Sequence, residues 1–555
     1  MTTLTRLGGL LADAALGLPL RATPYEVERD LPVPMPDGVA LLADRYRPAG
    51  AGPLPVVLIR LPYGRAGVFG AVFGAPLARR GLQVVLQSTR GTFGSGGHFR
   101  PFTTEHEDGP ATVAWLREQP WCDGRVAMTG GSYFGHTQWA VAPYVDPPLV
   151  SVSPHITAAK ITTAFYTHGA PGLQNALTWS ATIGRQEAAG LTAELPNPRI
   201  KAKIRRAARR LPLQAADTAV VGAPVPFWRD FTGHAGPGDE FWATADHDRA
   251  DLSRMPPVSM VTGWWDLFAA GQLADYAALR AAGVPARITV GPWLHGAPGE
   301  LRAILRDDVA WLDHHLRGGP APKGAPVRLF LQHAGRWLES EAWPPPESRP
   351  VAYHLRSGGG LTTEPGDGGD GPSRFTYDPA DPTPTVGGPL LQPPGKQADN
   401  RAVEARPDVL VFTGPPLAAD LDVVGPVRAR VHVRPELEHA DVFVRLCDVD
   451  PGGVSRNVVD GIRRLHPATV PAADVSAGAD GVLAVDVELF PTAYRVRAGH
   501  RLRVQVSGGA FPRFARNLGT GEPFATGTAG RPCRFEVFTD AAHPSRLLLP
   551  VLGRP

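Results

Sequence analysis

The first third of the chain alternates continuous apolar runs with a segment of helical periodicity. Two runs, "PVVLIRLPYG" (55–64) and "GLQVVLQSTRG" (81–91), have the unbroken Val/Leu/Ile character of strands that are buried on both faces. The segment "EDGPATVAWLREQP" (107–120) predicts a helix that ends before its last proline, and "GRVAMTGGS" (124–132) predicts the next strand. This rhythm predicts a mostly parallel sheet with helices on its faces.

The pattern changes between residues 155 and 251, where helical periodicity dominates and strand patterns are absent. The best helical segments there are "GLQNALTWSATIGRQEAAGL" and "IKAKIRRAARRL". The sheet pattern then returns with the strand "PPVSMVTGWWD", the helix "GQLADYAALRAAG" and the strand "ARITVGPWLHG". We therefore expect an α/β domain formed by residues 1–154 and 252–338, with residues 155–251 inserted as a helical cap.

The last part of the chain has a third kind of pattern. Glycine, proline and aspartate cluster in "SGGGLTTEPGDGGDGPS" (357–373), which predicts a surface loop or linker. Short alternating runs such as "VRARVHVRP", "ADVFVRLCDVD" and "GHRLRVQVSG" follow it, separated by turns. Regular short strands of this kind predict an all-β sandwich or jelly roll over residues 339–555.

Composition narrows the classes of function. The 56 Lys and Arg residues nearly balance the 53 Asp and Glu residues, so charge gives no reason to expect a nucleic-acid partner. The three cysteines (Cys122, Cys447 and Cys533) are odd in number and far apart, which favours reduced thiols over a disulfide framework. The apolar N-terminal stretch is interrupted by Asp13, and no run of eighteen apolar residues occurs. We expect a cytoplasmic protein with no membrane partner.

One short stretch, "MTGGSYFGHTQWA" (128–140), carries a candidate nucleophile. Ser132 lies between a strand pattern and a helix pattern, where a sharp turn would expose its hydroxyl at the edge of the sheet. The usual elbow pattern, Gly-x-Ser-x-Gly, would place a glycine where this chain has Phe134. A serine that caps a helix among packing glycines fits this stretch equally well.

Two further residues favour the catalytic alternative. A serine nucleophile needs a base that takes its proton and a carboxylate that orients the base. In α/β-hydrolases these follow in the order Ser, Asp or Glu, His, each after a strand. Asp266 directly follows the predicted strand "VSMVTGWW", and His295 follows "RITVGPW". The order and the positions together favour a catalytic triad.

Four motifs resemble one family. "RLPYGR", "GGSYFG", "GWWDLF" and "GPWLHG" are similar to motifs of the cocaine esterase and X-prolyl dipeptidyl-peptidase (CocE/NonD) family of serine hydrolases, whose elbow is spelled Gly-x-Ser-Tyr-x-Gly. The resemblance covers nearly the whole chain. It implies an α/β-hydrolase domain, a helical cap inserted before the acid, and a C-terminal jelly roll.

The resemblance also implies roles for individual residues. Ser132 would be the nucleophile, Asp266 the orienting acid and His295 the base. The oxyanion hole would consist of the Tyr63 hydroxyl and the backbone N–H of Tyr133.

Two aromatic residues correspond to residues that line the family's substrate pocket. These are Trp179, in the predicted cap, and Phe268, two residues after the acid. Both fit equally well as ordinary core aromatics.

The sequence thus predicts an esterase that forms an acyl-enzyme, needs no cofactor and acts on a small-molecule ester or acyl substrate as a monomer or homodimer. No metal site is expected, because the pair His314–His315 and the stretch "DHDRAD" lack a usable ligand spacing. Two alternatives stay open. One is an amide-directed relative, such as an X-prolyl dipeptidyl-peptidase, a β-lactam acylase or an α-amino acid ester hydrolase. The other is a carbohydrate-binding protein with an inactive hydrolase domain.

Overall fold

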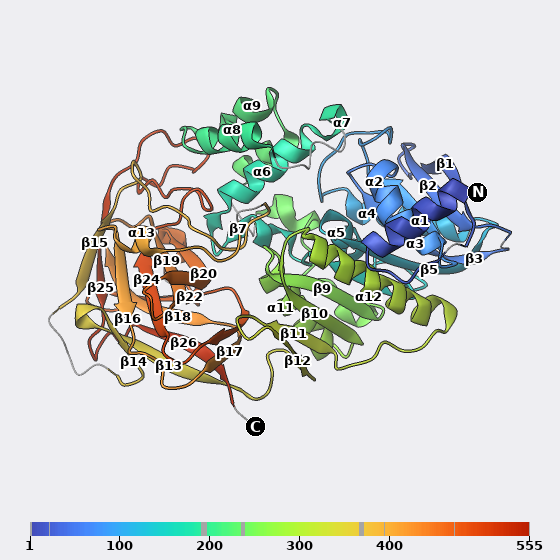
Figure 1. The fold of residues 1–555 in the computed structure, drawn as a ribbon. Coiled ribbons are helices and arrows are strands. Elements are labelled where there is room, and N and C mark those ends of the chain that lie inside the picture. The colour runs from blue at the N-terminus through green and yellow to red at the C-terminus, as the bar shows by residue number, and fades with distance from the viewer. Residues whose placement is uncertain are drawn as a thin grey trace.

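The computed structural model has an α/β body and an all-β body, with a layer of helices across the top of both (Figure 1). The structure describes residues 3–21, 23–50, 52–189, 197–234, 239–365, 371–392, 395–470 and 472–553. The predicted α/β-hydrolase domain, helical cap and separate all-β domain are confirmed. Among the described residues, no helix has both the length and the apolar character needed to cross a membrane.

The α/β body is built on a mixed sheet whose described strands lie in the order β1-β2-β4-β3-β5-β6-β9-β10-β11-β12. The strands are β1 (Tyr25–Pro34), β2 (Ala40–Pro48), β3 (Leu54–Leu61), β4 (Gln83–Ser88), β5 (Cys122–Gly131), β6 (Val152–His155), β9 (Val258–Trp265), β10 (Ala286–Leu294), β11 (Val327–Leu331) and β12 (Arg336–Ser340). From β4 to β11 all neighbours are parallel, whereas β1, β2 and β12 pair antiparallel at the edges. The carboxyl ends of the parallel strands therefore share one edge, where α/β enzymes place their ligands.

Helices cover both faces of this sheet. Along β3, alternate residues enter different cores: Val57, Ile59 and Leu61 face one, and Val56 and Leu58 face the other. Helices α3 (Ala75–Ala78) and α12 (Pro298–Arg317) complete the first core, and α4 (Glu105–Arg117) and α11 (Ala269–Ala281) complete the second. Burial on both faces explains why these strands read as unbroken apolar runs.

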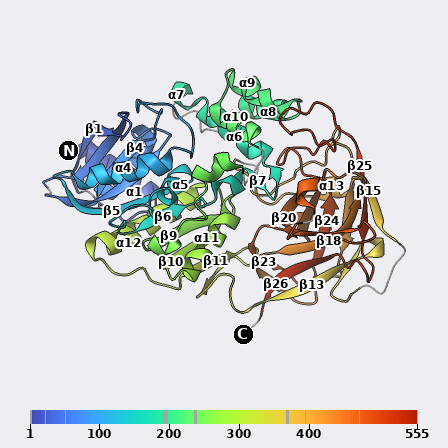
Figure 2. The same cartoon turned by 180° about the vertical axis from the view of Figure 1, so that it is seen from behind.

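The cap lies between β6 and β9 in the chain and covers the junction of the two bodies (Figure 2). Its helices are α6 (Leu173–Ile183), α7 (Gln186–Ala189), α8 (Pro198–Ala208), α9 (Ala216–Val221) and α10 (Pro226–Gly233). No strand was predicted here, but two-residue strands, β7 (Tyr166–Thr167) and β8 (Ala170–Pro171), pair with each other. The first predicted helix ends at Ile183, and the end of its segment, residues 190 and 191, lies outside the described residues.

The C-terminal body is an all-β domain with mostly antiparallel pairs. Its strands are β13 (Ser348–Arg356), β14 (Gly360–Thr362), β15 (Ser373–Tyr377), β16 (Val409–Thr413), β17 (Leu421–Gly425), β18 (Arg428–Pro435), β19 (Ala440–Val449), β20 (Ser455–Leu465), β21 (Val475–Ala477), β22 (Leu483–Glu488), β23 (Thr492–Val496), β24 (Arg501–Ser507), β25 (Cys533–Phe538) and β26 (Arg546–Leu552). Strand β14 lies inside the glycine-rich stretch that was predicted as a loop.

Backbone hydrogen bonds and aromatic contacts join the two bodies. The N–H of Gln332, just after β11, donates to the Ala493 carbonyl at 2.9 Å, and the Arg495 N–H donates back to the Gln332 carbonyl at 3.0 Å. The rings of Trp264 and Trp343 lie 6.0 Å apart at the same junction. The all-β domain is therefore packed against the sheet, not attached through a free linker.

Candidate active site

Ser132 occupies the sharp turn between β5 and α5 (Tyr133–Trp139). Its φ of 59° and ψ of −123° are strained for a residue with a side chain, and its side chain makes no capping hydrogen bond to the helix. Gly130 also has a positive φ, and a Cβ built there would lie 2.4 Å from the Phe134 ring. At Gly135 a Cβ would lie 2.7 Å from the His155 carbonyl oxygen. The glycines allow the close strand–helix approach, and the strain favours a functional role for the serine over helix capping.

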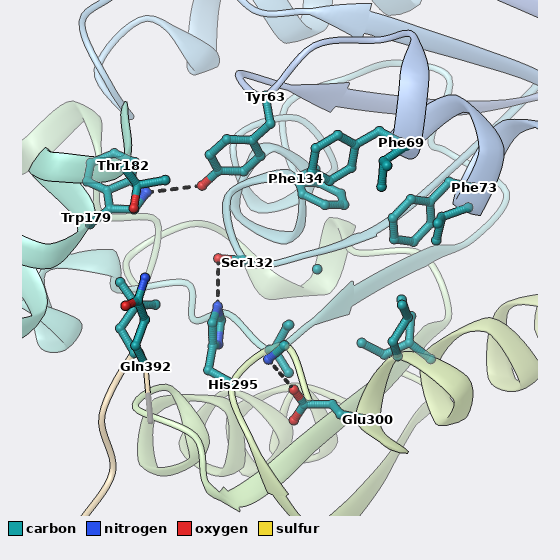
Figure 3. A pocket seen from close by; sticks show the side chains of 18 residues that line it. Tyr63, Phe69, Phe73, Ser132, Phe134, Trp179, Thr182, His295, Glu300 and Gln392 are labelled. Atoms are coloured by element: carbon teal, nitrogen blue, oxygen red, sulfur yellow. Dashed lines mark hydrogen bonds between the residues drawn. The ribbon is translucent and has the colours of Figure 1, made fainter. Parts of the chain in front are cut away.

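The three residues predicted as a triad form one chain of hydrogen bonds (Figure 3). His295 Nε2 lies 3.1 Å from Ser132 Oγ, and His295 Nδ1 lies 2.7 Å from Asp266 Oδ2. Asp266 follows β9, is fully buried, and accepts the Phe268 N–H on its other oxygen at 2.8 Å. The three side chains come from the carboxyl ends of β5, β9 and β10, so the parallel sheet brings them together.

A buried polar network holds the turn beneath Ser132. The Ser132 N–H donates to the His155 carbonyl at 3.0 Å. The His155 imidazole in turn contacts Asp308 of α12 at 3.0 Å, and the Thr129 hydroxyl donates to the same carboxylate oxygen. The side chains of His155 and Asp308 are both fully buried. This network ties β5, β6 and α12 together and fixes the backbone from which the nucleophile projects.

Tyr63 lies two residues beyond the end of β3 and faces the same space as Ser132 (Figure 3). Its hydroxyl oxygen accepts a hydrogen bond from the Trp179 indole N–H at 3.1 Å. Its ring stacks on Phe69 with a centroid distance of 5.7 Å and meets Phe134 edge-on at 6.2 Å. A phenol oxygen that accepts from an N–H retains its own proton for donation.

Tyr133 is the first residue of α5, so its backbone N–H has no acceptor within the helix. Its side-chain hydroxyl has buried partners of its own: it donates to Glu105 at 2.8 Å and accepts the Phe102 N–H at 3.0 Å. Glu105 also pairs with Arg60 at 2.5 Å. Burial raises the pKa of the Tyr133 phenol well above its ordinary value and raises the pKa of the Glu105 carboxyl. The buried phenol is therefore an anchor that fixes the peptide carrying the N–H.

Two hollows meet at Ser132. The larger has a volume of about 390 Å³ and extends past His295 toward α12, and the smaller has a volume of about 20 Å³. Trp179 lines both hollows, whereas Phe268 lines only the smaller one and its ring lies 5.6 Å from His295. Both predicted pocket aromatics therefore border the site.

The structure adds pocket residues that the sequence did not identify. They are Val68, Phe69, Val72, Phe73, Thr182, Glu300, Leu301, Ile304, Leu391 and Gln392. The pattern "VFGAVF" has apolar residues at helical spacing, a signal that could have marked the first four. Leu391 and Gln392 come from a loop of the all-β domain, and no local signal marks them.

Glu300 is a buried acid in the first turn of α12. It accepts the Gly296 N–H at 2.8 Å, one residue after His295. Burial, and then the nearby charge of Asp266, raise the pKa of its carboxyl well above the ordinary value, which favours the neutral form.

Comparison with family models assigns both bodies. Residues 37–297 match the model of the X-Pro dipeptidyl-peptidase (S15 family), and residues 323–548 match the model of the X-Pro dipeptidyl-peptidase C-terminal non-catalytic domain.

Curated and solved proteins give similar results. The chain is 31% identical to the cocaine esterase of Rhodococcus sp. (strain MB1 Bresler) over 574 residues, covering 96% of this chain and 99% of that one. An α-amino acid ester hydrolase structure has a TM-score of 0.77 at 22% identity, covering 96% of this chain and 98% of the other. A CocE/NonD family hydrolase from Staphylococcus aureus has a TM-score of 0.68 at 17% identity, covering 95% and 93%. At these sequence identities, the two structural matches show a shared fold.

Proposed function

This chain belongs to the CocE/NonD family of serine hydrolases, which act on esters or peptides, and on that premise we propose that it cleaves carboxylic esters through an acyl-enzyme. The observation that carries the proposal is the hydrogen-bond chain from Ser132 through His295 to Asp266 on a strained turn. In this proposal Ser132 is the nucleophile, His295 the general base and acid, and Asp266 the group that orients His295.

Acylation would involve two proton transfers, the first from Ser132 to His295 and the second from His295 to the leaving alkoxide. As Ser132 Oγ bonds to the ester carbonyl carbon, its proton passes to His295 Nε2, and the buried Asp266 carboxylate stabilises the imidazolium. The carbonyl oxygen becomes an oxyanion, to which the Tyr63 hydroxyl and the Tyr133 N–H donate. The carbon–alkoxy bond then breaks, and the alkoxide leaves with the proton from His295. Water repeats the sequence on the acyl-enzyme and frees the acid.

The preference for esters over peptides rests on the charge of the pocket. A dipeptidyl-peptidase must bind the substrate's α-ammonium group, which requires an ionised carboxylate. Among the described residues that line the two hollows at Ser132, Glu300 is the one carboxyl group, and its raised pKa favours the neutral form. A neutral acid beside aromatic walls suits an uncharged ester better than a cationic amine.

The test combines covalent labelling with kinetics. A fluorophosphonate probe should add to the wild-type protein at Ser132, and p-nitrophenyl acetate should be hydrolysed much faster than Gly-Pro-p-nitroanilide. Ser132→Ala should lose the label and at least about 10⁴-fold in kcat, because a triad nucleophile has no substitute. Ser253→Ala, at an exposed serine in the short helix Leu252–Arg254 before β9, is the matched control and should keep both. Retention of more than about a tenth of wild-type turnover in Ser132→Ala would rule out this serine as the nucleophile.

A further inference from the structure

The two hollows at Ser132 differ strongly in size, and they share part of their walls. Ser132, Tyr63, Trp179 and Leu391 line both of them. Figure 3 looks into the larger hollow, with Phe69, Phe73 and Phe134 on one side and Trp179, Thr182 and Gln392 on the other. A substrate held at Ser132 would thus place one of its halves in each hollow.

The position of His295 decides which half goes where. His295 must give its proton to the departing alkoxide, so the alcohol half must lie beside Nε2. His295 and the neighbouring Gly296 line only the larger hollow. The smaller hollow is lined instead by Tyr133, whose N–H is proposed for the oxyanion hole, and by Phe268. The larger hollow is therefore the alcohol side, and the smaller is the acyl side.

The acyl side has little room and stiff walls. A volume of about 20 Å³ corresponds to about one or two water-sized groups. The Trp179 ring stacks on Phe102 with a centroid distance of 5.1 Å and meets Phe227 edge-on at 4.4 Å. Its indole N–H is also bonded to Tyr63, so a swing of this ring would break a hydrogen bond as well as the packing. The acyl side therefore cannot widen by a movement of Trp179 without disturbing the proposed oxyanion hole.

The alcohol side is large and mostly apolar. Its far wall consists of Val68, Phe69, Val72 and Phe73 from the segment after β3. Leu301 and Ile304 of α12 complete it. Such walls favour a bulky hydrocarbon or aromatic group, because its apolar surface leaves water on binding.

We propose that the enzyme selects esters of short acids, of acetyl or propionyl size, with bulky apolar alcohols. This inference rests on the proposed esterase function and adds the direction of the substrate in the site. It separates this chain from an esterase that accepts a large aromatic acyl group.

A pair of isomeric esters tests which half of the substrate enters which hollow, and this test needs no amino-acid substitution. 2-Naphthylmethyl acetate and methyl 2-naphthylacetate contain the same atoms, and both release an unactivated primary alcohol or methanol. The acetate should have a kcat/KM at least about 100-fold higher, since a site can reject a group that does not fit by this factor. Equal values, or a preference for the methyl ester, would overturn the assignment.

Two variants probe the hollows separately. Ile161→Ala, at a buried residue that lines only the smaller hollow, should raise kcat/KM for p-nitrophenyl butyrate relative to p-nitrophenyl acetate. Val72→Phe, in the larger hollow, should lower kcat/KM for 2-naphthylmethyl acetate by a larger factor than kcat/KM for methyl acetate. The opposite pattern would overturn the proposal.

Labelling with the fluorophosphonate probe distinguishes a failure of this inference from a failure of the esterase proposal. Labelling of Ser132 together with a preference for the methyl ester would leave the esterase proposal intact and overturn the direction alone. Failure of both esters together with an unlabelled Ser132 would overturn the esterase proposal and, with it, this inference.

Discussion

Replacing Tyr63 by phenylalanine removes one oxygen atom and leaves the ring in place. The stacking on Phe69 at 5.7 Å and the edge contact with Phe134 at 6.2 Å involve the ring alone and should persist. The lost hydroxyl is one of two proposed donors to the oxyanion. Loss of one such donor lowers kcat by about 10²–10³-fold, which corresponds to about 3–4 kcal/mol of the barrier.

The same substitution also affects stability, through Trp179. The indole N–H donates to the Tyr63 oxygen at 3.1 Å, and Trp179 is only 7% exposed. Without its acceptor this N–H is left buried and unpaired, which costs about 1–3 kcal/mol of unfolding free energy. We therefore expect a measurable loss of stability in urea besides the loss of turnover.

The assay is steady-state hydrolysis of p-nitrophenyl acetate, with kcat and KM resolved separately. Because the oxyanion forms only during reaction, kcat should fall and KM should stay nearly constant. Trp179→Phe is the comparison variant: it removes the indole donor but keeps the phenol, and it should cost less than about tenfold in kcat, the value of one ordinary hydrogen bond. A Tyr63→Phe enzyme with undiminished kcat would refute the role of the phenol and leave the hole to backbone donors.

Three further predictions concern the elbow, a buried histidine and the all-β domain. Gly130→Ala should lower the unfolding free energy by about 1–3 kcal/mol and abolish most of the activity, because the new Cβ would lie 2.4 Å from the Phe134 ring. The control Gly124→Ala, with a positive φ but open space, should stay active. Burial lowers the pKa of His247 from 6.5 to about 4, so the unfolded chain binds a proton on this residue more readily than the folded one. The free energy of unfolding should therefore be highest above about pH 6.5 and should fall as the pH drops to 4. In urea titrations, His247→Gln should remove about 3 kcal/mol of this pH dependence of the unfolding free energy. A chain cut after residue 340 should aggregate or lose most of its p-nitrophenyl acetate hydrolysis, and a monodisperse, fully active fragment would contradict this.

The parts of the fold that could be predicted are those whose burial is uniform along the element. Strands β3, β4 and β9 are buried on both faces, so their apolar runs identify them. Strand β1, "YEVERDLPVP", was not predicted: it is mostly exposed, contains two prolines, and its register with β2 shifts between Glu28 and Leu31.

Long-range pairing explains the strands that were not predicted in the all-β domain. Strand β26, "RLLLPVL", contains a proline that would argue against a strand, yet it pairs with β13 through seven residues from Ser348 to His354. Whether a strand can contain a proline depends on its partner strands, and these are distant in the sequence.

The candidate site likewise has one part that could be predicted from the sequence and one part that could not. Ser132, Asp266 and His295 each follow a recognisable strand, and the geometry of a parallel sheet brings strand ends to one edge, so their proximity could be predicted. The pocket could not be. Gln392 reaches it from a loop of another domain, and Leu391 is held there by a backbone N–H that donates to Asn175 of the cap at 3.0 Å. Contacts of this kind have no local signature.

This division of the site has a consequence for how the enzyme can change over generations. The reacting groups stand on the sheet and its buried network, whereas the selective walls come from the cap, the segment after β3 and the loop that carries Leu391 and Gln392. Substitutions in the walls leave the strand ends in place, so descendants can acquire new substrates while inheriting an unaltered reaction. Diversification can thus proceed in parts of the gene that leave the reaction untouched, with one exception: Trp179 is a wall residue whose indole is bonded to the proposed oxyanion donor Tyr63.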